Sequence, residues 1–216
     1  MSSQPSVPAL EHPARSPRRD AVQNYHRILD AARELFAESG ADAGIEDIAA
    51  RAGVGIGTVY RRFASKDALV DELVRLATAE ITVAADLALA RADGHGLEEL
   101  LRVIGRSFAD HARYADLMFN RPADPEASRQ IRAAVEALTA RAAAAGTVNP
   151  SVAASDVMAL IWAMRGVAQA TGELAPTAWP RYLDIHLAGL RAEGPLSSVP
   201  AMTAAQLAQL SPPPPR

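Results

Sequence analysis

The sequence predicts an all-α protein in which a short N-terminal helical bundle is followed by a larger helical region. Alanine is frequent and aromatic residues make up only 5% of the 216 residues, which favours helices over strands. Apolar residues recur at helical spacing, and no useful stretch alternates with the period of two typical of strands. Gly and Pro separate the apolar stretches, so they divide the chain into individual helices.

The composition excludes several classes of protein. Hydrophobic residues form 49% of the chain, enough for a substantial core, and cysteine is absent, which excludes disulfides and thiolate chemistry. No apolar run approaches the ~18 residues of a membrane helix, and no signal peptide is recognisable, so we expect a soluble cytoplasmic protein. The five histidines show no close pair at ligand spacing, so no metal and no other cofactor is expected.

Residues 1–19 are rich in Pro and Ser and carry Arg15, Arg18 and Arg19. This composition predicts a disordered basic arm. Such an arm could contact DNA phosphates or the minor groove, or it could be a solvated leader without a role. The net charge of −3 does not indicate a nucleic-acid partner, and the first 66 residues hold nine Arg and Lys against eight Asp and Glu.

The first helix is expected at 20–39, where one apolar stripe recurs at helical spacing. Gly40 follows this helix and suits a left-handed C-terminal cap. The stripe consists of Ile28, Ala31, Ala32, Leu35 and Phe36.

Two short helices are expected next, at 45–52 and 56–62, joined through Gly53. Two short helices that cross steeply need a small residue at the crossing, a glycine in the turn, and apolar anchors beneath. The spacing meets each of these demands and predicts a helix-turn-helix. The residues concerned are Ile48, Ala49, Gly53, Val54, Val59 and Phe63.

This packing leaves a second face of the 56–62 helix exposed. A glycine, Gly57, would allow close approach to DNA, and Thr58 and Tyr60 could donate to phosphates. Either arginine could hold a phosphate or read a guanine edge, and Ile56 could pack on a thymine methyl group. A plain structural hairpin would not require such a face. Its residues are Ile56, Gly57, Thr58, Tyr60, Arg61 and Arg62.

A longer helix begins after Ser65, whose hydroxyl can cap it, and places Lys66 in its first turn. The free backbone amides there favour a phosphate, so Lys66 joins the predicted DNA contacts. Arg51, on the helix before the turn, is expected to be a solvated residue.

Residues 20–75 resemble the TetR family of bacterial transcriptional regulators. Four motifs occur in order: Leu-Phe-Ala-Glu-Ser-Gly, Ile-Ala-Ala-Arg-Ala-Gly-Val, Gly-Thr-Val-Tyr-Arg-Arg-Phe and Ser-Lys-Asp-Ala-Leu. The resemblance implies that Gly44 and Gly55 also lie in the DNA-binding region. Gly44, Gly55, Ile56 and Arg62 differ from the residues common in the family, which leaves the operator sequence open. The remaining two thirds of the chain resembles the family only in helical content and length.

The resemblance implies a homodimer that binds a palindromic operator and is released by a small-molecule effector. It assigns dimerisation to helices expected at 151–172 and 177–192. Small residues would allow close packing there: Ala153, Ala154, Ala159, Ala163 and Ala168.

The domain division that we expect is an arm at 1–19, a DNA-binding domain at 20–66, a regulatory and dimerisation domain at 67–192, and a Pro-rich tail at 193–216. Further helices are expected near 96–112 and 124–145, and one helical turn near 202–209.

The C-terminal region contains apolar and polar side chains that could line an effector pocket, although ordinary core packing explains each of them as well. These candidates are Phe108, His111, Tyr114, Met118, Trp162 and Arg165.

Three functional classes remain open at this point. The first is a repressor gated by a small molecule, and the second is a regulator gated by a protein partner or lacking an effector. The third is a small helical enzyme, although no nucleophile elbow, phosphate loop or other catalytic constellation is recognisable. Activation of transcription also remains possible, because the position of the operator relative to the promoter decides whether a bound regulator activates or represses.

Overall fold

The structure is a computed structural model that describes residues 17–119, 121, 124–172, 174–175 and 177–209. Within these ranges every regular element is a helix, which confirms the all-α prediction. Most of the expected basic arm, and the final Pro-Pro-Pro-Pro-Arg segment, lie outside the described residues. No helix in the described part of the chain combines the length and apolar character needed to cross a membrane.

The N-terminal helices lie close to their expected positions. Helix α1 (Pro17–Ser39) begins three residues earlier than expected, because proline suits the first turn of a helix, where its missing N–H is not needed. After a 3-10 turn η1 (Gly40–Asp42) come α2 (Ile45–Ala52) and α3 (Ile56–Arg62). Gly40 has a φ of +55°, as the expected left-handed cap requires.

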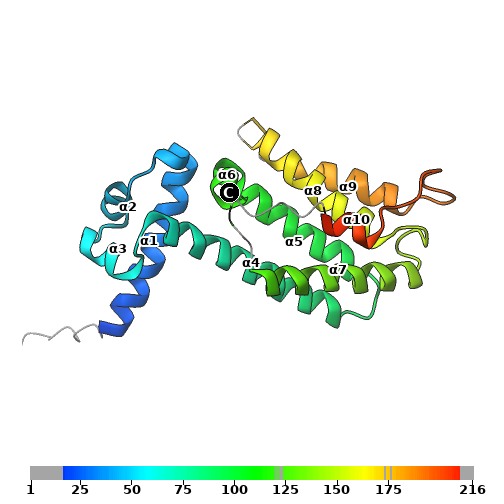
Figure 1. The fold of residues 1–216 in the computed structure, drawn as a ribbon, viewed down its shortest axis with the longest axis horizontal. Coiled ribbons are helices and arrows are strands. Elements are labelled where there is room, and N and C mark those ends of the chain that lie inside the picture. The colour runs from blue at the N-terminus through cyan, green and yellow to red at the C-terminus, as the bar shows by residue number, and fades with distance from the viewer. Residues whose placement is uncertain (1–16, 120, 122–123, 173, 176, 210–216) are drawn as a thin grey trace, which may run out of the picture.

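Helix α4 (Lys66–Ala90) connects the N-terminal helices to the rest of the chain (Figure 1). The hydroxyl of Ser65 accepts a hydrogen bond of 3.1 Å from the Ala68 amide, so the predicted N-cap is confirmed. The first turns of α4 pack on α1 through Leu69, Val70 and Leu73, and its later turns join the C-terminal core.

The C-terminal helices gather around a central one, α5 (Gly96–His111), which packs against α4, α7, α8 and α9. The elements that follow it are η2 (Ala112–Tyr114), α6 (Ala115–Phe119), α7 (Pro125–Ala144), α8 (Ala154–Thr171), α9 (Trp179–Leu190) and α10 (Ala204–Gln209). The last of these confirms the helical turn expected near 202–209. The short pair η2 and α6 was not predicted, because neither glycine nor proline marks its boundary with α5.

Helix α8 starts at Ala154 instead of residue 151, and Asn149 provides the reason. Its Oδ1 accepts hydrogen bonds from the Ser151 amide (2.9 Å) and hydroxyl (2.7 Å), a turn that competes with helix formation. Its Nδ2 donates to the carbonyls of Ala192 (2.7 Å) and Gly194 (2.8 Å). Asn149 therefore ties the α7–α8 connection to the end of α9.

The structure has two hydrophobic cores, and the N-terminal core includes residues from a later part of the chain. The C-terminal core combines buried residues from α4, α5, α7, α8 and α9. The N-terminal core combines α1 to α4 with two residues that arrive from much later in the chain, Tyr114 of η2 and Met118 of α6. The segment that follows α5 is therefore packed onto the N-terminal bundle.

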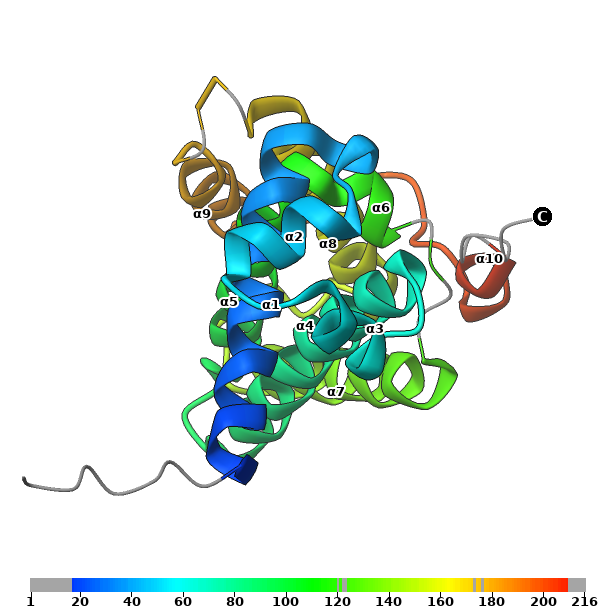
Figure 2. The same ribbon diagram turned by 90° about the vertical axis from the view of Figure 1, so that its left-hand side faces the viewer.

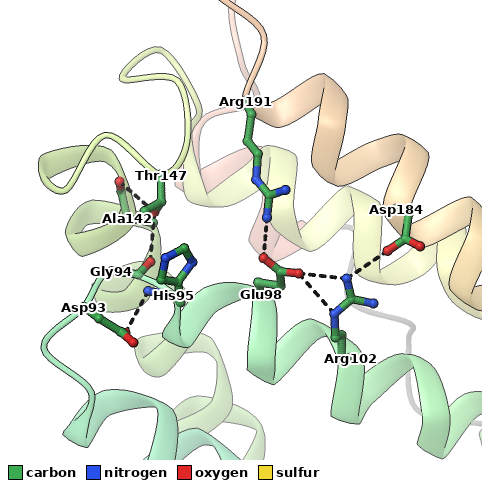
Figure 3. A network of polar contacts seen from close by, with 9 residues as sticks. All are labelled: Asp93, Gly94, His95, Glu98, Arg102, Ala142, Thr147, Asp184 and Arg191. Carbon is green, nitrogen blue, oxygen red and sulfur yellow. Dashed lines mark hydrogen bonds and ion pairs between the residues drawn. The ribbon is translucent and has the colours of Figure 1, made fainter.

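A polar network fastens α5 to α9 on the outside of the C-terminal core (Figure 3). Glu98 accepts hydrogen bonds from Arg102 (2.7 Å) and from Arg191 at the end of α9. Arg102 also pairs with Asp184 at 2.8 Å. Burial alone would raise the pKa of Glu98, but the two arginines outweigh it and lower the pKa.

Candidate nucleic-acid interface

The crossing of α2 and α3 is built as the sequence predicts. Ile48 and Val59 are fully buried, and Ala49 is buried where the helices approach each other. Gly53 has a φ of +62°. The Gly53 amide donates a hydrogen bond to the Ala50 carbonyl (3.1 Å), and the Val54 amide donates one to the Ala49 carbonyl (3.0 Å), so both cap the end of α2. The left-handed backbone angle of Gly53 is the reason that the turn requires glycine, because a Cβ would otherwise meet only the movable end of the Arg27 side chain.

Arg51 is exposed, as the sequence suggests, but it also forms ion pairs that were not predicted. Its guanidinium donates to both carboxylate oxygens of Glu38 (3.1 and 2.9 Å) and to Glu34 at 3.0 Å. These hydrogen bonds are the main reason that the pKa of Glu38 is lowered. Arg51 thus links α2 to α1 through ion pairs, a role that its sequence position alone did not indicate.

The outward face of α3 is available for a partner (Figure 2). Ile56 is 41% exposed and Tyr60 is 52% exposed, although both are large apolar or aromatic residues. Thr58 is half-buried, and Gly57, Arg61 and Arg62 are exposed. Apart from the half-buried Thr58, the predicted DNA-binding residues of this helix are therefore exposed, whereas Val59 and Phe63 anchor the helix to the N-terminal core.

The glycines of this region differ in whether the fold requires glycine at their positions. A Cβ at Gly57, or at Gly55 directly before α3, would meet no atom within 4 Å. Gly44 and Gly55 are the N-cap residues of α2 and α3, with ordinary extended backbone and no side-chain cap. Neither Gly55 nor Gly57 is thus required by internal packing.

Lys66 lies at the first turn of α4 as expected, but its ammonium group is already engaged. The Nζ atom donates to the Ala41 carbonyl and lies 5.6 Å from the centre of the Phe36 ring. Lys66 therefore holds η1 against α4, and a phosphate contact from it stays a prediction.

Arg62 and Arg61 have different surroundings, although they are neighbours at the end of α3. The Arg62 guanidinium carbon lies 4.7 Å from the centre of the Tyr25 ring, in cation–π geometry. Tyr25 was missed by the sequence analysis. It lies three residues before Ile28, so the helical stripe could have been extended to include it.

Three of the six residues considered for an effector pocket take part in the two hydrophobic cores. Tyr114 and Met118 belong to the N-terminal core, whereas Phe108 packs against the C-terminal core. Trp162 and Arg165 are half-buried on α8. For Tyr114 and Met118, packing against the DNA-binding helices accounts for the burial.

His111 lies near the junction between these cores. Its Nδ1 is 2.5 Å from the Ser107 carbonyl, and its ring meets that of Tyr114 edge-on at 5.6 Å. Burial lowers the pKa of His111 and raises that of Tyr114 to about 12. Both groups are consequently neutral at physiological pH.

No group of three or more His, Asp or Glu residues in the described part of the chain is arranged to hold a metal ion.

The surface around α3 offers an exposed helix with aromatic, hydroxyl and arginine groups on a rigid support. Such a surface suits the backbone and major groove of duplex DNA.

Comparisons with known proteins agree with this geometry. Residues 28–73 match the sequence model described as bacterial regulatory proteins of the tetR family, and residues 100–192 match the one for the C-terminal domain of SbtR-like transcriptional regulators. An HTH-type transcriptional repressor of Mycobacterium tuberculosis is 41% identical over 92 residues, covering 38% of this chain and 45% of the relative. The chain is thus aligned with less than half the length of that relative.

Two solved structures match over nearly their whole length. A TetR regulator from Streptomyces coelicolor is 30% identical, with a TM-score of 0.59, and the match covers 78% of this chain and 99% of that one. One from Mycobacterium vanbaalenii is 31% identical, with a TM-score of 0.59 and coverage of 82% and 100%. This chain therefore belongs to the TetR family of DNA-binding transcriptional regulators.

Proposed function

We propose that this protein represses transcription by binding a palindromic operator as a homodimer, and that a small-molecule effector releases it. The observation that carries the DNA-binding part is the outward face of α3. Its large side chains Ile56 and Tyr60 stay exposed, and Gly57 is not needed by the fold. The name of the M. tuberculosis relative supports repression as the direction of control.

The proposed DNA contacts follow from where each residue lies on α3. Residues near the start of a recognition helix reach base edges, so Ile56 and Gly57 would lie closest to the bases. Thr58 and Tyr60 would donate to phosphates, and the arginines at the end of the helix would bind the DNA backbone. Gly44 and Gly55 would keep the approaches to α2 and α3 open.

The proposed dimer interface is the face formed by α8 and α9, which lie together along one edge of the molecule (Figure 1). Tyr182 and Ile185 of α9 are 40% and 53% exposed. They are accompanied by exposed small residues that permit close helix packing. These are Ala163 and Gly166 on α8, and Ala188 and Gly189 on α9.

One expected interface residue must be withdrawn. Ala168 is only 3% exposed, because its side chain points into its own subunit instead of outward. Ala163 is exposed, and Ala153, Ala154 and Ala159 are half-buried, so these four remain compatible with the proposal.

The effector step is supported by the shared N-terminal core. Tyr114 and Met118 follow α5 directly and pack among the DNA-binding helices. A molecule that moved the end of α5 would therefore disturb the support of α1 and α4. By linkage, any such effector must weaken DNA binding by the factor by which DNA weakens effector binding.

The test of operator binding is selection of bound sequences from a random duplex pool at physiological salt. We expect a palindrome whose half-sites lie about 34–36 Å apart, or a multiple of that spacing. A Tyr60→Ala, Arg62→Ala double variant serves as the control and should enrich nothing. Enrichment of unrelated sequences, or of none by the folded wild type, would refute the proposal.

The test of the dimer is sedimentation of Ile185→Asp beside Val83→Asp. Val83 is 58% exposed on α4, outside the proposed interface, so it controls for adding a charge to an exposed apolar site. We expect Ile185→Asp to be monomeric and to bind the palindrome poorly, and Val83→Asp to remain dimeric. Two equally dimeric variants would place the interface elsewhere.

A further inference from the structure

Tyr25 of α1 contacts α3, the proposed recognition helix, and α4 at the same time. The Arg62 guanidinium carbon lies 4.7 Å from the centre of its ring. The ring is also stacked with Phe63 at 6.0 Å between centres and 24° between planes. Its hydroxyl donates a hydrogen bond to Glu72 of α4. One side chain thus connects the end of α3 to both neighbouring helices.

The far end of this connection is itself fixed. Arg75 donates to both oxygens of Glu72, from Nε at 2.7 Å and from Nη2 at 2.8 Å. The Glu72 side chain is only 19% exposed, and the hydrogen bonds from Arg75 lower its pKa to about 2. The acceptor for the Tyr25 hydroxyl therefore remains ionised and in place, and the plane of the ring is held.

The neighbouring Arg61 supplies a built-in comparison. It is also exposed at the end of α3, but its side chain has no hydrogen bond, ion pair or ring contact with any residue that the structure describes. An arginine that must be ordered on binding weakens the complex by roughly two- to tenfold relative to one already ordered. The two arginines therefore start from different states before DNA arrives.

We infer that Tyr25 is a positioning residue for DNA binding: its ring holds the Arg62 guanidinium in one orientation before the protein meets DNA. Arg62 is the last residue of α3, so its partner is a backbone phosphate, which the planar guanidinium can bind through two parallel hydrogen bonds. Arg61 has to be ordered on binding. This inference rests on the proposed DNA-binding role of α3.

The first experiment needs no substitution. Nitrogen-15 relaxation of the arginine Nε–H groups, measured on the DNA-free protein, compares the two side chains directly. We expect a clearly higher order parameter for Arg62 than for Arg61. Equal mobility of the two groups in the wild type would overturn the inference.

The second experiment is a double-mutant cycle on the selected operator. Tyr25→Leu keeps apolar volume against Phe63 but removes the cation–π surface, so we expect affinity to fall about two- to tenfold. The slope of log affinity against log salt should stay close to the wild-type slope, because Arg62 can still reach its phosphate. Arg62→Ala should weaken binding about tenfold and reduce the slope by about 1.

The cycle separates positioning from a general structural role. If Tyr25 acts through Arg62, Tyr25→Leu has no further effect in the Arg62→Ala background, but keeps its full effect in the matched Arg61→Ala background. Tyr25→Phe, which retains the ring, should restore binding to within about twofold of wild type. An equal loss in both arginine backgrounds would show that Tyr25 only stabilises the domain.

The inference and the proposed function fail in distinguishable ways. If the wild type selects no operator, both fail. If Arg62→Ala weakens binding but Tyr25→Leu binds like the wild type, only the positioning role is lost. Should Tyr25→Leu not fold, the relaxation comparison of Arg62 with Arg61 in the wild type still decides the question.

Discussion

The recognition helix and the segment after α5 use the same residue type in opposite ways. Tyr60 on α3 is 52% exposed, whereas Tyr114 in η2 is 4% exposed and packs beside Phe36. Both residues drew notice in the sequence, one as a DNA contact and one as a pocket residue. The two tyrosines therefore differ in what accounts for them: core packing explains Tyr114, whereas Tyr60 lies on the surface together with Ile56, where DNA binding is proposed.

Removing each of the two tyrosine side chains in turn tests whether Tyr114 supports the core and Tyr60 does not. Tyr114→Ala should lower the free energy of unfolding by about 3–5 kcal/mol, the range for truncating a buried aromatic residue. Tyr60→Ala should change it by no more than about 0.5 kcal/mol, as expected for an exposed site. Denaturant unfolding of the two variants under identical conditions measures both values.

The same two variants should differ in the opposite direction in their affinity for operator DNA, which Tyr60→Ala should lower more than folded Tyr114→Ala does. Tyr60→Ala should weaken binding by about 1–3 kcal/mol while the protein stays folded. The folded fraction of Tyr114→Ala is expected to recover much of its affinity at low temperature, since Tyr114 does not face the DNA. A Tyr60→Ala variant that unfolds easily, but binds normally once folded, would reverse the roles assigned to the two residues.

The N-terminal region was predictable because its constraints are local. The glycine at 53, the small residue Ala49 and the anchors Val59 and Phe63 lie within a single short stretch, and each follows from two helices crossing closely. Helix positions and the exposed face of α3 could therefore be derived from spacing alone. The family resemblance added Gly44 and Gly55, which the structure places at the two N-caps.

What the sequence did not reveal depends on contacts between distant parts of the chain. Tyr114 and Met118 return to the N-terminal core from a segment about 40 residues beyond it, and no periodicity records such a return. The ion pairs of Arg51 were not predicted because its partners Glu34 and Glu38 lie on another helix. The link between Tyr25 and Glu72 likewise spans 47 positions.

The comparison between the two regions extends to their ion pairs. Glu72 in the N-terminal region and Glu98 in the C-terminal region are both paired with arginine, and both have lowered pKa values. For Glu72 the pKa falls from its ordinary 4.5 to about 2. Its stabilising effect is therefore complete above pH 4.5 and is lost as the pH falls towards 2.

We accordingly expect Glu72→Gln to be about 1 kcal/mol less stable than the wild type at neutral pH, a value that allows for screening by water. The difference should shrink as the pH falls from 4.5 towards 2 and vanish below pH 2, once the wild-type carboxyl group is protonated in the folded state as well. Unfolding at a series of pH values measures it, with Glu98→Gln as the matched change in the other region. A constant difference across that range would show that the Glu72 ion pair contributes no pH dependence.

Gly57 provides the smallest expected effect and the most direct test of what the exposed face of α3 is for. Alanine favours helix, and a Cβ at this position meets no atom within 4 Å, so Gly57→Ala should raise the free energy of unfolding by about 0.5–1 kcal/mol. If α3 enters the major groove at this residue, the same methyl group must push the helix away from the bases, and affinity for the selected operator should fall. Stability and binding would then change in opposite directions, a result that no packing role for Gly57 can produce. A variant that gains stability and binds DNA as well as the wild type would instead mean that the start of α3 stays clear of the floor of the major groove.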